Sequence, residues 1–399
     1  MFYQTNKYKL TEGNHCVFLE NGTQFFQKLK QSINNAKEFI HFQVYIYNED
    51  ETGKYIAELL ENAAKRNVQI HMVLDAYGSN NLSVKFINYL KSFCTTFKFF
   101  SPLFVKYKIN IGLRMHHKIF VFDGQYALIG GINIANKYSG INYTQQWLDF
   151  GLFINGPSVY QLNKICIATI NRNPMNKKIL SGILVEPKIS GNIALRILQN
   201  DKYRNKIGIT RAYRNNIRKS QQSITIISSY FLPSNSFRRL LIQAAIRNVN
   251  IKLVLGEVSD TKLVLFATRY FYKTLLKQGI EIYEWQKTVL HGKLAVFDLK
   301  TTTIGSYNLN ALSDFGSLEC NAEILNEEFS KEVSNTINKK ILPNCRMVDA
   351  DIFNRKYSFV HHLLNKISYH ILIFLLNYLF LLQKKSAENI LHDTEINEY

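Results

Sequence analysis

The chain carries the same widely spaced motif twice, and this duplication constrains its fold more than any other feature. In each copy, a lysine follows a histidine by two positions, and an aspartate and a Gly-Gly-x-Asn or Gly-Ser-x-Asn segment come at fixed distances after them. The two sets are His116, Lys118, Asp123, Gly130, Gly131 and Asn133, and His291, Lys293, Asp298, Gly305, Ser306 and Asn308. They lie 175 residues apart and differ in one residue type, which predicts two halves of similar structure.

The repeat extends beyond the motif. Residues 63–74 read AAKRNVQIHMVL and residues 244–255 read AAIRNVNIKLVL, and each segment predicts a helix end, an Asn turn and a buried strand. A further apolar strand is predicted before each, at 39–47 and 223–231. Strands that alternate with helices in both halves predict α/β layers.

Breaks in the pattern divide the chain into three parts. Pro187 and Gly191 interrupt the apolar periodicity between the two motifs. We therefore predict an N-terminal half at 1–190 with the first motif and a C-terminal half at 191–355 with the second. A membrane-associating helix and a polar tail are predicted at 356–399.

Each motif is predicted to form a strand, a turn and a second strand. Because side chains of a strand alternate between its faces, His116 and Lys118 are expected on one face and His117 on the other. We interpret His117 as a packing or rim residue rather than a catalyst. Gly124 and the later glycines permit a tight turn and close backbone approach to a phosphate.

Two histidines and two lysines at one centre suit covalent phosphoryl chemistry without a metal or other cofactor. Lysine and amide donors neutralise the non-bridging oxygens of a phosphodiester. A neutral imidazole can then attack phosphorus, while a second, protonated imidazole donates to the leaving alcohol. A duplicated motif supplies both imidazoles, and both protonation states are accessible near neutral pH.

Charge and cysteine usage narrow the partners and the compartment. The net charge of +19 and the pI near 9.5 indicate an anionic partner, either nucleic acid or an acidic membrane surface, although a Lys-, Asn- and Ile-rich composition also contributes. The five cysteines are scattered without a C-x-x-C, which favours a reducing compartment over disulfides or a zinc cluster. The first residues lack the apolar region of a signal peptide.

A C-terminal apolar segment, residues 367–383, has no acidic or basic residue except His370. Lys366 and the pair Lys384-Lys385 bracket it. Three interpretations are open: a helix in the membrane interface, a membrane span slightly short of the usual 20 or so residues, or a helix packed on the protein's own core. The flanking lysines and the aromatic residues favour the interface.

With these motifs in place, the chain resembles the phospholipase D superfamily and, within it, the bacterial cardiolipin synthases, over roughly residues 5–355. Flanking matches include Arg114, GGINIANKY at 130–138, Trp147–Asp149, YFLP at 230–233, GSYNLN at 305–310 and Glu319–Asn321. The resemblance implies two pseudo-twofold-related α/β/α sandwich halves with the active site between them. Gly292, Gly131 and Asn310 depart from the usual pattern but remove no group that the chemistry needs.

The resemblance also implies roles for individual residues. His116 matches the usual nucleophile and His291 the general acid and base, although the order can be reversed. Lys118, Lys293, Asn133 and Asn308 match the phosphate-binding set, and Asp149 and Glu319 match the carboxylates that orient the histidines. Asp123 and Asp298 complete the catalytic motif, where we expect them to stabilise the site structurally, and no metal is expected.

The leading hypothesis is a phosphatidyltransferase that makes cardiolipin from phosphatidylglycerol, with a second phosphatidylglycerol or phosphatidylethanolamine as acceptor, and releases a small alcohol. Its partners would be anionic phospholipids and a membrane surface at the cytoplasmic face of a bacterial inner membrane. The alternative is a phosphodiesterase that uses water, either a phospholipase D or a nuclease. The apolar C-terminal helix argues against nucleic acid, and two intact motifs argue against an inactive scaffold.

Overall fold

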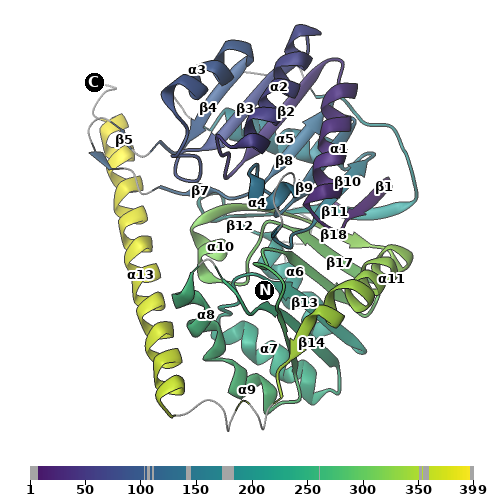
Figure 1. Cartoon of the computed structure of the whole chain (residues 1–399), viewed down its shortest axis with the longest axis vertical. Helices are drawn as coiled ribbons and strands as arrows, with labels where there is room; N and C mark the ends of the chain where they lie inside the picture. Colours follow the sequence, from purple (N-terminus) through teal and green to yellow (C-terminus); the bar gives the residue numbers. More distant parts are fainter. Residues whose placement is uncertain are drawn as a thin grey trace.

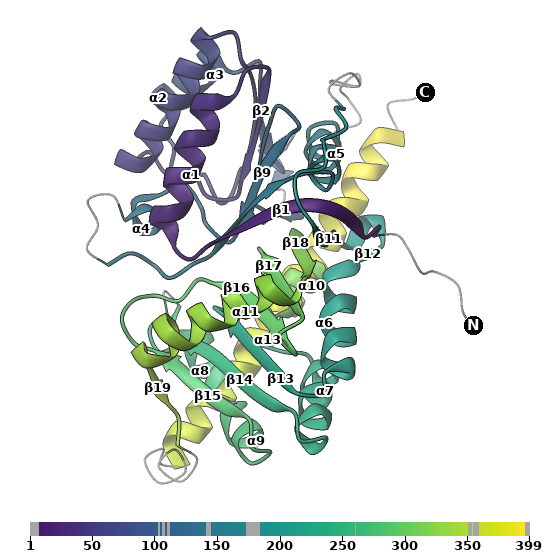
Figure 2. The ribbon, with the colours of Figure 1, turned by 90° about the vertical axis from the view of Figure 1, so that its right-hand side faces the viewer.

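Helices and strands follow one another in matching order in the two halves of the chain. The computed structural model describes residues 8–102, 104–105, 108–109, 112–140, 145–172, 184–259, 261–349, 353 and 359–395. The two halves stack on each other, with helices on the outer faces of their sheets (Figures 1 and 2). The prediction of two related α/β halves is confirmed.

The first half runs from β1 to α5. Its elements are β1 (Thr11–Leu19), α1 (Gly22–Asn35), β2 (Phe39–Val44), α2 (Glu51–Lys65), β3 (Gln69–Asp75), α3 (Val84–Phe93), β4 (Thr96–Phe100), β5 (Phe104–Val105), β6 (Lys108–Ile109), β7 (Arg114–Met115), β8 (Ile119–Phe122), β9 (Tyr126–Gly130), α4 (Asn136–Ser139), β10 (Gly151–Asn155) and α5 (Val159–Ile170).

The second half runs from β11 to β19. Its elements are β11 (Ile193–Asp201), β12 (Lys206–Ile207), α6 (Gly208–Lys219), β13 (Ser223–Ser228), α7 (Asn235–Ile246), β14 (Asn250–Gly256), α8 (Lys262–Arg269), α9 (Tyr272–Leu276), β15 (Glu281–Trp285), β16 (Lys293–Phe297), β17 (Thr301–Gly305), α10 (Ala311–Phe315), β18 (Ser317–Leu325), α11 (Glu327–Thr336) and β19 (Cys345–Met347). Short 3₁₀ or π turns lie at Lys202–Arg204, Ile337–Ile341 and Leu342–Asn344.

One chain of pairings joins the two sheets. The order is β4-β3-β2-β8-β9-β10-β1 in the first half and β11-β18-β17-β16-β13-β14-β15-β19 in the second, and β1 pairs antiparallel with β11 at the seam. In both halves the strand before the motif hairpin pairs with it: β2 with β8, and β13 with β16. The two hairpins thus occupy equivalent places.

The three largest of four buried apolar clusters hold these layers together. The outer clusters pack α1 and α2 on the first sheet and α6 and α7 on the second. The middle cluster combines side chains from the motif strands of both halves, such as Val121 and Val296, with others from α5 and α11. Because this core is shared, the two motif hairpins cannot shift independently of each other.

The repeated Arg-Asn pair has a structural role in each half. Asn67 and Asn248 adopt left-handed backbone conformations, with φ of 67° and 63°, at the turn predicted between helix and strand. The preceding arginines donate to carbonyls at the end of the neighbouring helix: Arg66 to Ile33 at 2.9 Å and Arg247 to Ile217 at 3.0 Å. Each arginine therefore satisfies carbonyls that a helix end leaves open.

The motif aspartates lie at the far end of each hairpin, in the turn. The carboxylate of Asp123 accepts hydrogen bonds from the backbone amides of Lys37, Glu38 and Phe39 at 2.8–3.0 Å. Asp298 does the same for the amides at 221–223, where β13 begins. Both aspartates thus anchor the start of a central strand to the motif hairpin, in keeping with the structural role expected of them.

The predicted strands are longer than the observed ones. β2 ends at Val44 and β13 at Ser228, whereas the pattern predicted strands to residues 47 and 231. Beyond β2, the amide of Ile46 donates to the side chain of Asn133 at 3.0 Å instead of to a neighbouring strand. The motif strands also begin late, since β8 starts at Ile119 and β16 at Lys293. These shortened strands leave both histidines just before the first residue of a central motif strand.

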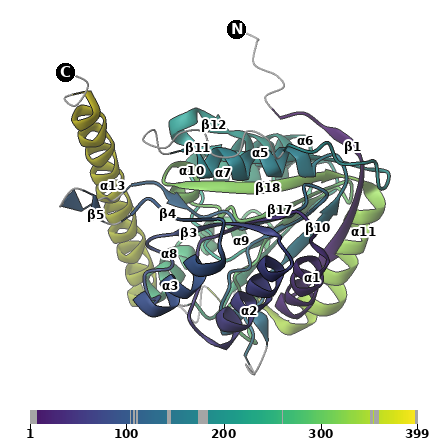
Figure 3. The same ribbon diagram turned by 90° about the horizontal axis from the view of Figure 1, so that it is seen from above.

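The C-terminal helix α13 (Phe359–Glu395) stands along one side of the molecule, clearest in Figure 3, and packs against α8. The ring of Tyr369 stacks on Tyr270 at a centroid distance of 4.8 Å, and Asn365 and Leu376 are buried on the same face. Over the part of the chain that the structure describes, no helix combines the length and apolarity needed to cross a membrane. One face of α13 thus packs on the protein, as one of the three interpretations proposed.

We expect Asp123→Ala to destabilise the protein by on the order of 3 kcal/mol, because three backbone amides lose hydrogen bonds to a charged acceptor. Urea unfolding measures this loss, and Glu327→Ala, which removes an exposed carboxylate, is the matched control. Any turnover per folded molecule should stay near normal. A loss of turnover without a loss of stability would contradict this structural role.

Candidate active site

Both histidines are tied by their backbone to the opposite half of the protein. The amide of His116 donates to the carbonyl of Leu318 at 3.0 Å, and the amide of His291 donates to that of Leu148 at 2.8 Å. In each case the acceptor immediately precedes the carboxylate that binds the histidine ring. The two halves therefore exchange equivalent segments around one centre.

His116, from the first half, is held by Glu319 from the second. Its Nδ1 lies 3.0 Å from both carboxylate oxygens of Glu319, whose side chain is completely buried. Two hydroxyls also donate to this carboxylate, Ser306 at 2.5 Å and Ser317 at 2.8 Å. Burial alone would raise the pKa of Glu319, but the interaction with His116, the charge of Lys118 and the Ser306 hydrogen bond outweigh burial and lower this pKa.

His291, from the second half, is held by Asp149 from the first. Its Nδ1 lies 2.5 Å from Oδ2 of Asp149, and the other oxygen accepts from the amide of Phe150 at 2.8 Å. Among the described residues no hydroxyl takes the place of Ser306 here, because a Cβ on Gly131 would lie 2.3 Å from Asp149. With fewer donors, burial raises the pKa of Asp149 to about 7.

The departures from the family pattern have local reasons. Gly131 makes room for the Asp149 carboxylate, which occupies the space that a serine would take. Gly292 makes room for the ring of Phe150, since a Cβ there would lie 2.4 Å from it. Both glycines therefore leave the space that Asp149 and the adjacent Phe150 occupy beside His291.

The two lysines are buried beside their own histidines. Lys118 Nζ donates to the carbonyl of His116 at 2.5 Å. Lys293 Nζ donates to the carbonyl of His291 and to the hydroxyl of Ser229, the latter at 3.1 Å. Burial, and next the charge of Lys293, lowers the pKa of Lys118 to about 7. A phosphate anion at this centre would favour the protonated forms of these two poorly solvated amines, which would then attract it strongly.

The motif asparagines differ in how fully the protein uses them. The Asn133 amide accepts from the backbone of Ile46 and donates to the Tyr138 hydroxyl at 3.1 Å, so it supports the site wall. The Asn308 oxygen accepts from the Ser229 hydroxyl at 2.7 Å, which places its amide beside Lys293. The predicted phosphate-binding role thus fits Asn308 more directly than Asn133.

Aromatic side chains surround the histidines unequally. The ring of Tyr45 packs edge-on against His116 at 5.0 Å and lies below Lys118. His291 packs against both Tyr138, at 5.3 Å, and Trp147, at 5.8 Å. Burial lowers the pKa of both histidines, and the charges of Lys293, Lys118 and His116 lower that of His291 further. The charge of each motif's lysine thus acts on the histidine of the other motif.

Sequence reasoning did not identify Tyr45, Ser229 or Ser317. Tyr45 and Ser229 occupy equivalent positions, each one residue after the central strand of its half, and each contacts the lysine of its own motif. Because the two residue types differ, alignment of the two repeats does not single these positions out. Ser317 stands two residues before Glu319, as Trp147 does before Asp149, and the different residue types leave no signal for it in the repeat.

Comparison with known proteins identifies the family of the chain. A family model described as "Cardiolipin synthase, PLD-like domain" matches residues 29–163 and 213–341. The chain is 30% identical to cardiolipin synthase B of Shigella flexneri over 353 residues, covering 86% of this chain and 84% of that protein. It is 29% identical to a cardiolipin synthase of Geobacillus kaustophilus, covering 80% of this chain and 64% of that protein.

Solved structures support the fold. A phosphatidylserine synthase of Haemophilus influenzae superimposes with a TM-score of 0.66 at 14% identity, covering 89% of this chain and 93% of that one. A polyphosphate kinase of Porphyromonas gingivalis superimposes with a TM-score of 0.56 at 12% identity, covering 85% of this chain and 49% of that one. At these identities the likeness concerns the fold alone.

We expect Lys118→Met to change stability in a pH-dependent way. The unfolded lysine binds a proton below its ordinary pKa of 10.5 but the folded one only below a pKa of about 7, so wild-type stability rises with pH across that window. The advantage of the variant over wild type should shrink by up to about 1.4 kcal/mol per pH unit from pH 7 to pH 10. Urea unfolding at several pH values measures it, with exposed Lys331→Met as the control. A constant difference would contradict the buried-lysine assignment.

Proposed function

Since the chain belongs to the phospholipase D-like cardiolipin synthase family, we propose that it joins two phosphatidylglycerol molecules into cardiolipin through a phosphohistidine intermediate. It is a phosphatidyltransferase, and the observation that supports this reaction most is the exchange of carboxylates between its halves. Each histidine receives its partner from the other motif's half, so both are poised at one centre.

His116 is proposed as the nucleophile. An ionised Glu319 accepts from Nδ1–H of His116 and leaves the Nε2 lone pair free to attack phosphorus. The P–N bond forms as the P–O bond to the glycerol headgroup breaks. The two lysines and Asn308 are proposed to bind the phosphate, with Asn133 supporting the wall beside them.

His291 is proposed as the acid and then the base. His291 carries a proton on Nε2, which it delivers to the departing glycerol oxygen, while its Nδ1 stays in the short hydrogen bond to Asp149. The neutral imidazole then takes a proton from a headgroup hydroxyl of a second phosphatidylglycerol. The new P–O bond forms, the P–N bond breaks, and both histidines return to their starting states.

The acceptor is proposed to be phosphatidylglycerol rather than phosphatidylethanolamine. Phosphatidylglycerol offers free headgroup hydroxyls to the base, whereas the ethanolamine headgroup offers an amine and no free hydroxyl. Water could replace the hydroxyl in the same step and would give phosphatidic acid. The distinction between transferase and hydrolase therefore depends on the products.

The outer face of α13 is proposed to contact the membrane. Leu364, Ile367, Ile371, Phe374 and Tyr378 follow helical spacing on the side opposite Tyr369, and each is between 44% and 69% exposed. An apolar stripe of this kind suits insertion into a lipid interface, and the net charge of +19 complements anionic headgroups. We propose attachment at the cytoplasmic face of a bacterial inner membrane, a reducing environment that suits the free cysteines of the described chain.

Purified protein incubated with phosphatidylglycerol vesicles should produce cardiolipin and glycerol, detected by lipid mass spectrometry. His116→Ala and His291→Ala should each lower the rate by about 1,000-fold or more, because each removes a group used in both steps. The rate should be unchanged by EDTA. Phosphatidic acid as the main product would contradict the proposed transfer and would show that the protein acts as a phospholipase D.

Peptide mass spectrometry of a quenched reaction tests the assignment of the nucleophile. A phosphatidyl adduct should map to the peptide that contains His116. An adduct on His291 would reverse the two roles. Near-normal activity of either alanine variant would contradict a mechanism that uses both histidines at one centre.

We expect the triple variant Leu364→Gln, Ile371→Gln, Phe374→Gln to lose most flotation with phosphatidylglycerol vesicles. The matched control is Val84→Gln, Ile246→Gln, Val258→Gln, which changes three exposed apolar residues elsewhere and should float like wild type. Equal flotation of both variants would contradict the proposal. A variant that instead changes the molar mass in solution would make this face a contact between copies of the chain.

A further inference from the structure

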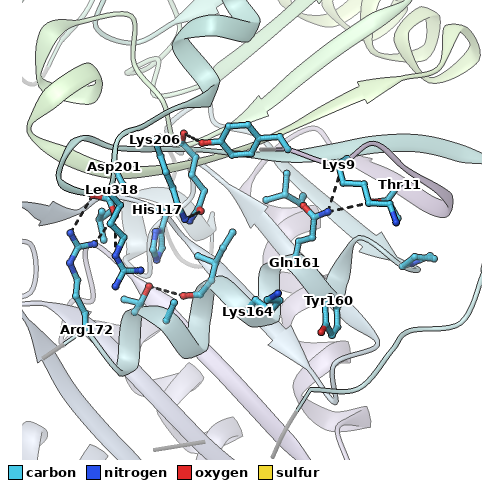
Figure 4. A pocket seen from close by; sticks show the side chains of 18 of the residues that line it. Lys9, Thr11, His117, Tyr160, Gln161, Lys164, Arg172, Asp201, Lys206 and Leu318 are labelled. Carbon is cyan, nitrogen blue, oxygen red and sulfur yellow. Dashed lines mark hydrogen bonds and ion pairs between the residues drawn. The ribbon is translucent and has the colours of Figure 1, made fainter. Parts of the chain in front are cut away.

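A second pocket lies on the side of the catalytic strands away from the two histidines. It occupies about 740 Å³ between α5, β11 and β12, and Figure 4 shows the side chains that line it. This volume is in the usual range for small-molecule sites. None of its described lining residues is a catalytic histidine, a motif lysine, a motif aspartate or a carboxylate partner, although His117 lies between His116 and Lys118 in the chain.

Cationic side chains dominate the walls of this pocket. Five are present, against the two carboxylates of Glu186 and Asp201: Lys9, Lys164, Arg172, Arg204 and Lys206. The guanidinium of Arg172 is fixed by two bonds to Asp201, at 2.9 and 3.2 Å. Lys206 Nζ is held by the Gln199 side chain at 2.5 Å. The excess of positive charge, partly held in place by these contacts, favours an anionic occupant.

The floor of the pocket contains a buried ring nitrogen whose hydrogen-bonding capacity is unused. His117 is 1% exposed, and its Nε2 lies 2.9 Å from Oε1 of Gln43, whose amide nitrogen donates to the Cys166 carbonyl. The Gln43 oxygen is therefore the acceptor, which places the His117 proton on Nε2. Within the described chain, Nδ1 of His117 has no hydrogen-bond partner, and burial lowers the pKa of this histidine to about 3. A neutral acceptor of this kind can accept a hydrogen bond from a ligand, for example from a hydroxyl.

The same floor is continuous with the catalytic centre. Leu318 faces the pocket and Glu319, the next residue on β18, faces His116, as alternation along a strand requires. The amides of His116 and His117 both donate to the Leu318 carbonyl, at 3.0 and 2.9 Å. A ligand that moves His117 or Leu318 would therefore move the His116–Glu319 pair.

We propose that this pocket binds a small phosphate-bearing anion with a free hydroxyl, of the size of a glycerol phosphate headgroup, and that its occupancy changes the catalytic rate. The cationic walls hold the phosphate, and the hydroxyl reaches the acceptor at the floor. The ligand's source is either a free phosphate ester or the headgroup of an anionic lipid.

Equilibrium dialysis of the full chain with labelled sn-glycerol 3-phosphate tests the binding. Wild type should bind two equivalents, one at each site. The double variant Lys164→Gln, Lys206→Gln should lose the equivalent bound in this pocket. The double variant Lys118→Gln, Lys293→Gln should lose the equivalent bound at the catalytic centre. The control Lys65→Gln, Lys331→Gln makes the same charge change at exposed helix positions and should retain both.

A single equivalent that disappears with Lys118→Gln, Lys293→Gln would overturn the proposal. So would loss of binding in the control, which would indicate general charge attraction. The binding measurement involves no turnover, so it can fail or succeed independently of the proposed reaction.

Two further experiments identify the source of the ligand and its effect on the catalytic rate. Phosphatidylglycerol vesicles that displace the label from the Lys118→Gln, Lys293→Gln variant identify a lipid headgroup, and failure to displace it identifies a free ester. With phosphatidylglycerol as substrate, saturating sn-glycerol 3-phosphate should change kcat at least twofold in wild type and leave Lys164→Gln, Lys206→Gln unchanged. Equal responses in both would overturn the coupling.

Discussion

The structure depends on the pairing of buried ionisable groups across the boundary between its halves. Glu319 and Asp149 are buried carboxylates, and Lys118 and Lys293 are buried amines at the same centre. Removing such groups from water is costly unless they have charged or hydrogen-bonding partners. Each carboxylate finds its histidine in the other half, so neither half alone can satisfy its own buried groups. This requirement adds to the shared apolar core as a reason for the two halves to dock in one arrangement.

Within this near-symmetry the two histidines differ because their carboxylates differ. Glu319 accepts from two serine hydroxyls and its pKa falls, whereas Asp149 has one backbone donor and its pKa rises. The difference begins with one methylene group and with Gly131 in place of a serine. A duplicated motif with identical environments would give two similar imidazoles. We propose that these unequal environments suit His116 to attack phosphorus and His291 to donate a proton.

The motif aspartates lie away from the histidines and stabilise the position of the motif hairpins. Asp123 and Asp298 fix the far ends of the hairpins to the starts of β2 and β13. Those two strands then end beside the lysines, where Tyr45 and Ser229 contact them. The repeated spacing between lysine and aspartate thus reflects the length of a short strand. The aspartate anchors one end of this strand to the fold, and the lysine at the other end lies beside the histidine.

The sequence by itself determined the duplication, the α/β alternation and the identity of the histidines, lysines and aspartates, because these follow from spacing and local periodicity. It also determined the Asn turns and an apolar C-terminal helix. Only the tertiary structure decided which carboxylate serves which histidine, which face of α13 packs on α8, and that His117 and Leu318 form the floor of a second pocket. Those pairings join residues up to 203 positions apart in the chain, and local sequence carries no information about which distant partner will neutralise a buried charge.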